Sequence, residues 1–233
     1  MRNDFVCVPP LCLALLAMFA SPLEAQSETR LFGQVNVSHH KFENTVVGGT
    51  FPGLLQHQGT EALSLEIGVQ SRAWLPLEIS LKAEEIDYEL DQAFFYKLRK
   101  LDDGQLHHAG LTPAAYDGNL QLLSLNTNYT FEKEFTGFRP FVGLGLIKGT
   151  FKTPQSDYTD PDVDGYSLSL GLYYDVSPSA YFKIGLSRHD LSVDARHMGR
   201  PTAMTGLPEF IPESTLDYEG VWIGFGLQTQ SMR

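Results

Sequence analysis

Apolar and polar residues alternate with a period of two through most of the chain after residue 30. The stretch from Tyr166 to Leu186 is the clearest case, because its leucine and isoleucine residues share one face while serine, glycine and Lys183 share the other. Such alternation is typical of a β-strand with different surroundings on its two faces. Val176 to Ser179 separate the two runs and include a proline that favours a turn. This stretch therefore predicts a β-hairpin.

The same alternation recurs in eight segments, which we interpret as the strands of a single sheet. Their connections alternate between long and tight from the first strand to the last. Eight antiparallel strands can close into a barrel without free edges, so the sequence predicts an all-β fold, an eight-stranded antiparallel up-and-down β-barrel. The predicted strands are residues 31–42, 62–73, 77–90, 119–131, 138–151, 166–175, 181–186 and 216–229.

Two places depart from simple alternation. In the third predicted strand, the apolar residues fall at odd numbers up to Leu81 and at even numbers from Ile86 onward. A β-bulge at Glu85 would produce this shift. In the longest connection, residues 91–118, the apolar positions from Phe94 to Leu101 have helical spacing and predict a short surface helix.

The N-terminal residues resemble an export signal. Residues 5–20 are almost wholly apolar, and the small residues that follow end at Ala25 before a polar stretch begins. This pattern predicts that residues 1–25 are a cleaved secretory signal peptide. Residues 26–233 are then predicted to form the barrel domain.

Composition narrows the possible functions further. The formal net charge of −11 argues against nucleic acid as a partner, since nucleic-acid-binding surfaces are basic. The two cysteines, Cys7 and Cys12, both lie within the predicted signal peptide, so the barrel domain is not a disulfide scaffold. After residue 25 the sequence contains no apolar run of about 20 residues, the length that a membrane-spanning helix requires.

The two faces of the strands indicate which one meets lipid. One face is aliphatic and almost free of charge, whereas the other combines glycine, serine and asparagine with a few charges of both signs. Small residues and paired charges suit the narrow interior of an eight-stranded barrel, and an aliphatic exterior suits a bilayer. We therefore predict a transmembrane barrel with an interior salt-bridge network. Its charged members are Glu66, Arg72, Glu78, Lys82, Glu84 and Lys183.

Aromatic residues cluster near the predicted strand ends. Transmembrane barrels carry aromatic girdles at both membrane interfaces, so we expect one girdle near each end. Near the tight turns it is predicted to contain Trp74, Phe131, Phe138, Tyr174, Tyr181 and Phe182. Near the long connections it is predicted to contain Phe42, Tyr88, Phe151, Tyr166 and Tyr218.

With these features, residues 31–229 resemble the small eight-stranded outer-membrane β-barrel family, OmpA/OmpX-like. The resemblance implies a Gram-negative outer membrane, tight turns in the periplasm, long loops outside the cell and insertion by the barrel-assembly machinery. The last strand resembles the family's assembly signal at Gly220, Ile223 and Phe225, but the chain does not end on an aromatic residue as many members do. No periplasmic peptidoglycan-binding domain is expected after the barrel.

Three sequence motifs could carry chemistry. Asp160, Asp162 and Asp164 match the opening of a calcium loop, but the glutamate required at its twelfth position is replaced by Gly171. We therefore expect a solvated acidic loop, with weak binding of a divalent cation as the alternative. The histidines show no spacing typical of a ligand set and are interpreted as loop or rim residues. Some outer-membrane barrels that act as lipid deacylases use a His-x-Ser pair on one strand, and no histidine here is followed by serine two residues later.

These observations predict a non-enzymatic integral outer-membrane protein without a cofactor. Its expected role is structural or surface-interactive, through four long extracellular loops. One alternative is a narrow conduit for small molecules across the outer membrane, and another is a soluble periplasmic barrel that binds an apolar ligand. We expect a monomer whose partners are outer-membrane lipid, lipopolysaccharide and, during biogenesis, the assembly machinery.

Overall fold

The computed structural model describes most of the predicted barrel domain. The described residues are 29–47, 53–57, 59–71, 76–88, 90–94, 118–132, 136–152, 160–194, 196–201, 208–211 and 213–229. The predicted signal peptide lies outside them and stays a prediction. Within these ranges no helix is long and apolar enough to cross a membrane.

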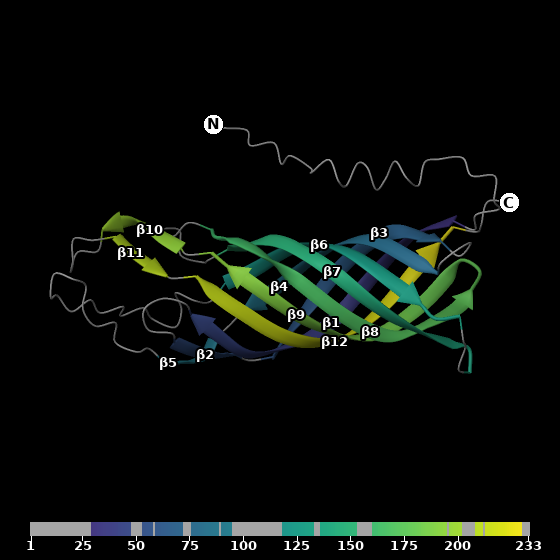
Figure 1. The fold of residues 1–233 in the computed structure, drawn as a ribbon, viewed down its shortest axis with the longest axis horizontal. Helices are drawn as coiled ribbons and strands as arrows, with labels where there is room; N and C mark the ends of the chain where they lie inside the picture. The colour runs from purple at the N-terminus through teal and green to yellow at the C-terminus, as the bar shows by residue number, and fades with distance from the viewer. Residues whose placement is uncertain are drawn as a thin grey trace, which may run out of the picture.

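Eight long strands form a closed antiparallel barrel (Figure 1). The order around the barrel follows the chain, and β1 pairs with β12 to close the ring. The predicted fold is therefore confirmed, including the alternation of long and tight connections. The barrel strands are β1 (Thr29–Val47), β3 (Gly59–Ser71), β4 (Leu77–Tyr88), β6 (Gly118–Thr130), β7 (Phe138–Lys152), β8 (Asp162–Ser177), β9 (Ala180–Val193) and β12 (Ser214–Gln228).

Four shorter strands lie beyond one end of the barrel, within the long connections. Three of these connections were predicted to be loops or a helix, and that prediction was wrong where the strands occur. The short strands are β2 (Gly53–His57), β5 (Leu90–Phe94), β10 (Arg196–Pro201) and β11 (Pro208–Ile211). β2 pairs with the extension of β1 and with β5, while β10 pairs with β11. Of the helix predicted from Phe94, only Phe94 is described, and it belongs to a strand.

We call the end that carries these short strands the loop end and the opposite end the turn end. The strands are strongly staggered around the barrel. Register partners followed once around from Val35 return to β1 at Val46, with one irregularity in the register near Phe42. A stagger of this size gives a strand tilt of about 40°.

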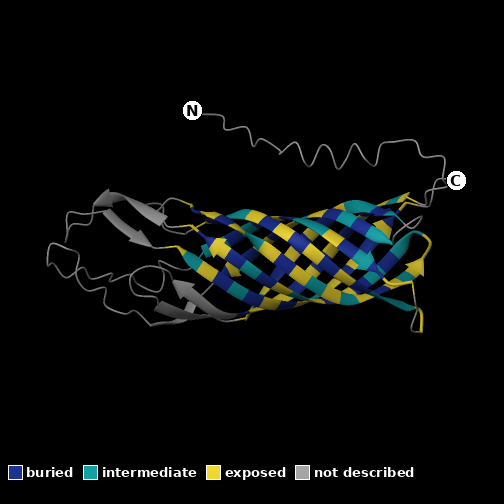
Figure 2. Ribbon diagram, viewed as in Figure 1, coloured by how far each residue is buried: buried dark blue, intermediate teal, exposed yellow. Residues whose placement is uncertain are grey.

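Exposed and buried residues alternate along the barrel strands (Figure 2). In the middle of the barrel the exposed, outward residues are mostly aliphatic and the buried, inward residues are mostly polar. We call the outward apolar residues the membrane belt. They are Leu31, Val35, Val37, Leu63, Leu65, Ile67, Leu81, Leu123, Val142, Leu144, Leu146, Leu168, Leu170, Leu172, Ile184, Leu186, Val221, Ile223, Phe225 and Leu227. Exposure of so much contiguous apolar surface is costly in water and favourable in lipid. The soluble alternative is therefore wrong.

Toward the loop end, both faces of the barrel reverse their polarity. On β4, the outward residue changes from Ala83 to Glu85, and the inward residue changes from Glu84 to Ile86. The register of β4 with β3 and β6 runs without interruption through Glu85, so the predicted bulge is wrong. The strand keeps its alternation through this point. The apolar residues lie on the outer face below it and on the inner face above it, because the surroundings of the barrel change there.

The reversal occurs in every barrel strand at a similar level. We call the charged outward residues nearest to the membrane belt on this side the polar collar. They are Lys41, Glu61, Glu85, Asp87, Lys148, Asp164, Arg188, Asp190, Asp217 and Glu219. The inward residues at the same level form a buried cluster, which we call the upper core. It comprises Phe42, Ala62, Ile86, Tyr88, Leu120, Leu122, Ile147, Phe151, Val163, Leu191, Val193, Leu216 and Tyr218.

Candidate functional site in the barrel interior

The interior is the candidate site, because it brings together nearly all the buried charged side chains of the described residues. It is divided into three layers. An aromatic layer lies near the turn end, a polar layer occupies the centre, and the upper core closes the loop end. Each layer follows from strand alternation, since every second residue of each strand must point inward.

The aromatic layer surrounds a buried ammonium group. Lys183 Nζ lies 5.3–5.8 Å from the ring centroids of Phe32, Tyr181, Tyr173 and Phe141. These distances are within the range of cation–π attraction. Lys183 Nζ also lies 2.5 Å from Glu78 Oε1, and both side chains are 2% exposed. The two side chains are thus shielded from water, and each neutralises the charge of the other.

Nearer the turn end, a second set of polar side chains forms contacts across the interior. Arg139 pairs with Asp175, and the Arg139 guanidinium lies 4.5 Å from the centroid of the Tyr173 ring. The Tyr173 hydroxyl donates to Asp175 Oδ1 at 3.0 Å and to Gln228 Oε1 at 3.2 Å, one proton being shared between two acceptors. Because these side chains come from β7, β8 and β12, their contacts span the barrel mouth.

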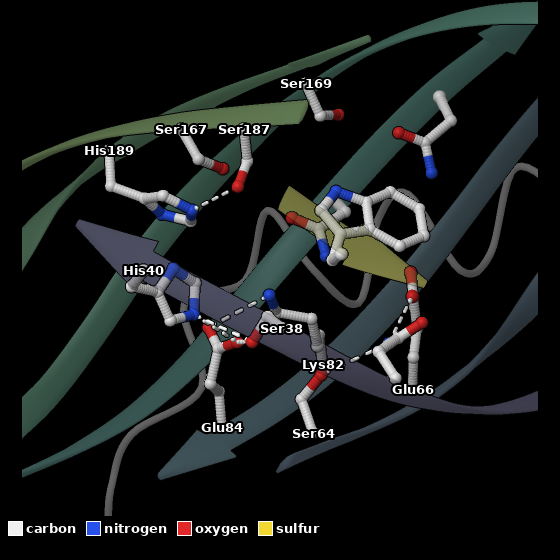
Figure 3. Close-up of a pocket in the computed structure, with 14 residues that line it drawn as sticks. Ser38, His40, Ser64, Glu66, Lys82, Glu84, Ser167, Ser169, Ser187 and His189 are labelled. Carbon is white, nitrogen blue, oxygen red and sulfur yellow. Dashed lines mark hydrogen bonds and ion pairs between the residues drawn. The ribbon is translucent and has the colours of Figure 1, made fainter. Parts of the chain in front are cut away.

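In the polar layer, a serine and a histidine of β1 meet a carboxylate of β4 (Figure 3). Ser38 Oγ lies 2.8 Å from His40 Nε2, and the same nitrogen lies 3.3 Å from Glu84 Oε1. Lys82 Nζ lies 2.9 Å from Glu84 Oε2. Glu84 therefore has a cation and a histidine as neighbours.

A second serine and histidine lie across the interior on β9. Ser187 Oγ is 2.9 Å from His189 Nε2, and the His189 ring stacks on Tyr218 with centroids 4.3 Å apart. The two serine–histidine pairs, one on β1 and one on β9, line the same cavity of about 40 Å³. That volume holds roughly three water molecules, since one water occupies about 10–15 Å³ on this measure.

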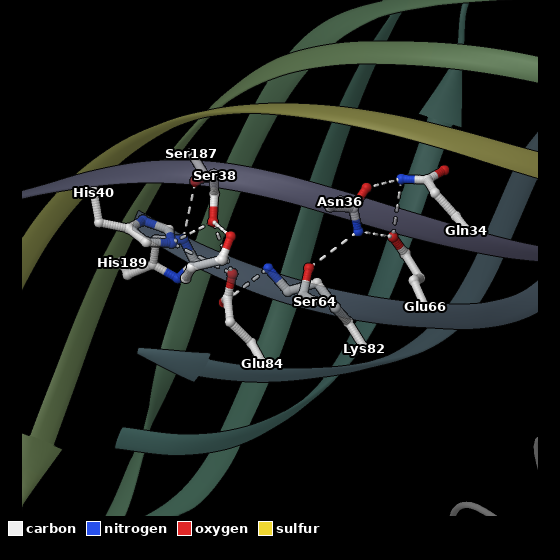
Figure 4. A network of polar contacts seen from close by, with 11 residues as sticks. Gln34, Asn36, Ser38, His40, Ser64, Glu66, Lys82, Glu84, Ser187 and His189 are labelled. Carbon is white, nitrogen blue, oxygen red and sulfur yellow. Dashed lines mark hydrogen bonds and ion pairs between the residues drawn. The ribbon is translucent and has the colours of Figure 1, made fainter. Parts of the chain in front are cut away.

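Glu66 has surroundings unlike those of the other buried carboxylates (Figure 4). Its donors are neutral: Ser80 Oγ contacts Oε1, Gln34 Nε2 lies 3.4 Å from Oε2, and Asn36 Nδ2 lies 3.5 Å from Oε2. Figure 4 shows the Lys82 ammonium turned toward Glu84 and away from Glu66. Glu66 is 5% exposed.

The Ser38–His40–Glu84 contacts resemble part of a hydrolytic triad but lack its arrangement. In a triad the carboxylate contacts one imidazole nitrogen and the nucleophile the other. Here a single nitrogen of His40 faces both Ser38 and Glu84, and the other nitrogen, Nδ1, has no hydrogen-bond partner. The upper core covers this layer toward the loop end. The geometry therefore does not support acyl transfer.

The interior leaves little room for a continuous pore. A β-carbon added at Gly143 would overlap Asn128 and Ser169, and one added at Gly185 would overlap the Trp222 ring. At the loop end, Ile86, Leu120 and Leu191 are each 0% exposed. Eight strands enclose a space that side chains can fill, and these residues fill most of it apart from the central cavity.

The structure places five of the six predicted interior charges inside the barrel, while Arg72 lies outside the described residues. Two ion pairs form among the five, Lys183 with Glu78 and Lys82 with Glu84. Glu66 has no cationic partner among the described residues. The pairing could not be read from the sequence, since the partners in the first pair are 105 residues apart.

Part of the predicted aromatic girdle at the turn end has the expected outward orientation. Phe131 and Tyr174 are exposed, and Phe138 and Phe182 are partly exposed on the outer face. Tyr181 is instead 1% exposed and faces inward, so its assignment to the girdle was wrong. It shares the parity of Lys183, two residues later, and therefore belongs to the aromatic layer. Trp74 is outside the described residues.

The predicted girdle at the loop end was largely wrong. Only Tyr166 faces outward, with 57% exposure. The other four aromatic residues are buried members of the upper core, because they lie above the level at which polarity reverses. They are Phe42, Tyr88, Phe151 and Tyr218.

The aspartate motif and two of the histidines lie within the described residues. Asp162 and Asp164 lie exposed on an extended strand, with Asp160 exposed just before it, so the three do not wrap around a common centre. No group of three or more histidine, cysteine, aspartate or glutamate side chains that could hold a metal ion occurs within the described ranges. His40 and His189 are buried in the interior, so their interpretation as loop or rim residues was wrong. A search for Ser-x-His on inward positions would have found both pairs.

A closed antiparallel barrel with an aliphatic exterior and a polar, filled interior defines the class of transmembrane β-barrels. The chain belongs to the outer membrane protein beta-barrel domain family, whose model matches residues 11–228. A search of curated proteins found no match to the sequence.

Solved outer-membrane barrels have a similar fold. OprG from Pseudomonas aeruginosa is 14% identical, with 90% of this chain and 100% of that chain covered and a TM-score of 0.54. Neisserial surface protein A is 13% identical, with 84% and 96% covered and a TM-score of 0.47. The N-terminal barrel domain of Pseudomonas aeruginosa OprF is 14% identical, with 84% and 96% covered and a TM-score of 0.39. At such identities the likeness concerns the fold alone.

Proposed function

We propose that this outer-membrane protein is a non-conducting, non-enzymatic scaffold that interacts with partners through its loop end. The observation that carries the proposal is the filled interior. Any solute crossing the barrel must pass the Lys183–Glu78 pair, the central polar layer and the upper core. Displacement of a buried ion pair and a packed apolar core is costly.

The loop end supplies a rigid platform for such an interaction. β1 continues past the polar collar and pairs with β2, which pairs with β5, so two of the long connections join in one sheet. Binding residues are commonly carried by connections that a rigid scaffold positions. Outer-membrane lipid and lipopolysaccharide, as the lipid partners, and the assembly machinery during biogenesis are parts of the same proposal, as is the monomeric state.

Planar-bilayer recording tests the closed interior. We expect the purified full chain to insert without unitary conductance in molar KCl. A reproducible single-channel conductance from heat-modifiable, folded protein would overturn the closed barrel and favour the conduit. Heat-denatured protein is the control for detergent leakage.

Photo-crosslinking in cells tests the position of the interaction surface. A photoreactive amino acid replaces Asp87 in the polar collar or Glu132 at the turn end, both of which are exposed. We expect discrete crosslinked species from position 87 and none beyond monomer from position 132. The opposite distribution would place the working surface at the turn end.

A further inference from the structure

The central polar layer carries one negative charge more than its described side chains neutralise. Two carboxylates, Glu66 and Glu84, lie in this layer, and among the described residues that line it Lys82 is the one cationic side chain. Lys82 is the cross-strand neighbour of Glu66, yet its Nζ pairs with Glu84. Glu78, the remaining buried carboxylate, is already neutralised by Lys183.

An ionised carboxylate buried without a counter-charge is strongly unfavourable. Glu66 nevertheless has the environment of an ionised group, since Ser80, Gln34 and Asn36 all present polar hydrogens to its oxygens. Protonation of His40 or His189 would place a second N–H at Nδ1, and neither Nδ1 has a hydrogen-bond partner. The missing positive charge is therefore expected in the space beside Glu66.

Carboxylate, amide and hydroxyl oxygens make up most of the lining of that space, which Lys82, His40, His189 and Trp222 complete. Glu66 lines the cavity together with Ser64 and the side chains that gather over two interior glycines. A β-carbon at Gly143 would meet Asn128 Oδ1 and Ser169 Oγ, and one at Gly145 would meet Asn126 Oδ1 and Ser167 Oγ. Carboxylate, amide and hydroxyl oxygens are the ligands that hard cations prefer.

We propose that the central cavity binds one monovalent alkali cation, with Glu66 as the charged ligand and amide and hydroxyl oxygens of β6 and β8 completing its shell. A single positive charge leaves the layer neutral, whereas a divalent ion would leave it with an excess. The cavity of about 40 Å³ accommodates the ion together with about two waters. This site does not depend on the proposed function, because it concerns the buried layer and not the loop end.

The test compares thermal unfolding of the full chain in nonionic detergent, in sodium chloride and in N-methylglucamine chloride of equal ionic strength. The bulky organic cation cannot enter the cavity. We expect sodium to raise the Tm with a saturating dependence, by about 5–10 °C when its concentration is 100 times the dissociation constant. Equal Tm values in the two salts over the whole range would overturn the proposal.

Substitutions identify the ligand. Glu66→Gln should abolish the difference between the two salts, whereas the matched control Glu85→Gln, on the outer face of β4, should retain it. Lys82→Met leaves two carboxylates without a cation and should enlarge the sodium effect. A Glu66→Gln variant that keeps the full sodium response would exclude Glu66 as the charged ligand.

A measurement on the unaltered protein covers the case in which Glu66→Gln does not fold. Sodium-23 relaxation should be faster with folded protein than with the same sample after heat denaturation, and excess potassium should reverse the difference. A Tm that rises on acidification in N-methylglucamine chloride, with no sodium effect on relaxation, would assign the neutralising charge to a proton and overturn the proposal.

Discussion

The membrane-spanning half of the barrel and its loop-end half use the same strands with opposite polarity. Around the membrane belt, leucine and valine face outward, and serine, asparagine and glutamate face inward. Around the polar collar, charged residues face outward and the thirteen residues of the upper core face inward. The backbone pairing is continuous through the boundary on β4.

This contrast shows that the surroundings, and not the strand itself, decide which face is apolar. In lipid, the exterior can satisfy apolar side chains, so the interior is free to be polar. In water, the hydrophobic effect drives apolar side chains inward as in a soluble barrel. The level at which the pattern inverts therefore marks where the barrel leaves the bilayer. Four experiments test whether the two halves differ in this way.

The largest effect is expected at the buried ion pair of the membrane-spanning half. Lys183→Met should destabilise the barrel by about 3–5 kcal/mol, because Glu78 remains buried without its cation. Urea unfolding in micelles measures the change. Adding Glu78→Gln to the same chain should recover much of the loss; an unchanged loss in the double variant would mean that the Lys183 contacts with the four aromatic rings, and not the ion pair, dominate.

The next effect concerns the upper core. Leu120→Ala should cost about 2–5 kcal/mol, since it opens a cavity among residues excluded from solvent. Leu123→Ala is the matched control, because Leu123 lies on the same strand but is 54% exposed in the membrane belt. Urea unfolding of the two variants should show the larger loss at position 120. Equal losses would contradict a packed core at the loop end.

A single arginine introduced on the outer face should have different effects on stability in the two halves. Leu144→Arg, in the membrane belt, should cost about 2–4 kcal/mol near the bilayer midplane. Ser192→Arg, on an exposed outward position of β9 near the loop end, should change stability by less than about 0.5 kcal/mol. Unfolding in liposomes gives both values. A tolerated arginine at position 144 would be incompatible with lipid at that surface.

The smallest change in stability is expected for single cysteines that report whether a position is accessible to water. Single cysteines at Asp87 and Leu170 are introduced into a chain whose Cys7 and Cys12 are replaced by serine. In liposomes, a membrane-impermeant maleimide should label position 87 rapidly and position 170 only after detergent is added. Both cysteines are outward-facing, so stability should barely change. Equal labelling rates before detergent would place the two positions in the same solvent.

The strand faces could be predicted from sequence because alternation is a local property. Leu168, Leu170 and Leu172 share a parity, and nothing beyond that is needed to place them on one face. Glu85 illustrates where local reasoning ends. A shift in the apolar pattern can arise from a bulge or from a change of solvent, and the residues near Glu85 are the same in both cases.

The candidate site was less predictable, for two physical reasons. Contacts across the interior, such as that between Lys183 and Glu78, depend on the stagger of the strands, which the sequence does not display. Tyr181 and Tyr218 were misassigned because an aromatic residue near a strand end suits either an interfacial girdle or a packed interior. Their parity with Lys183 and with Leu216 decides between the two.

The pairing of β1 with β12 also constrains how the molecule is made. Leu31 and Thr229, 198 residues apart, contact each other where the ring closes. Loop-closure entropy opposes such distant pairing until the chain between is ordered, so contacts of this range form slowly. The barrel therefore cannot close before β12 has been synthesised. Until its final strand arrives, the polypeptide needs protection from aggregation.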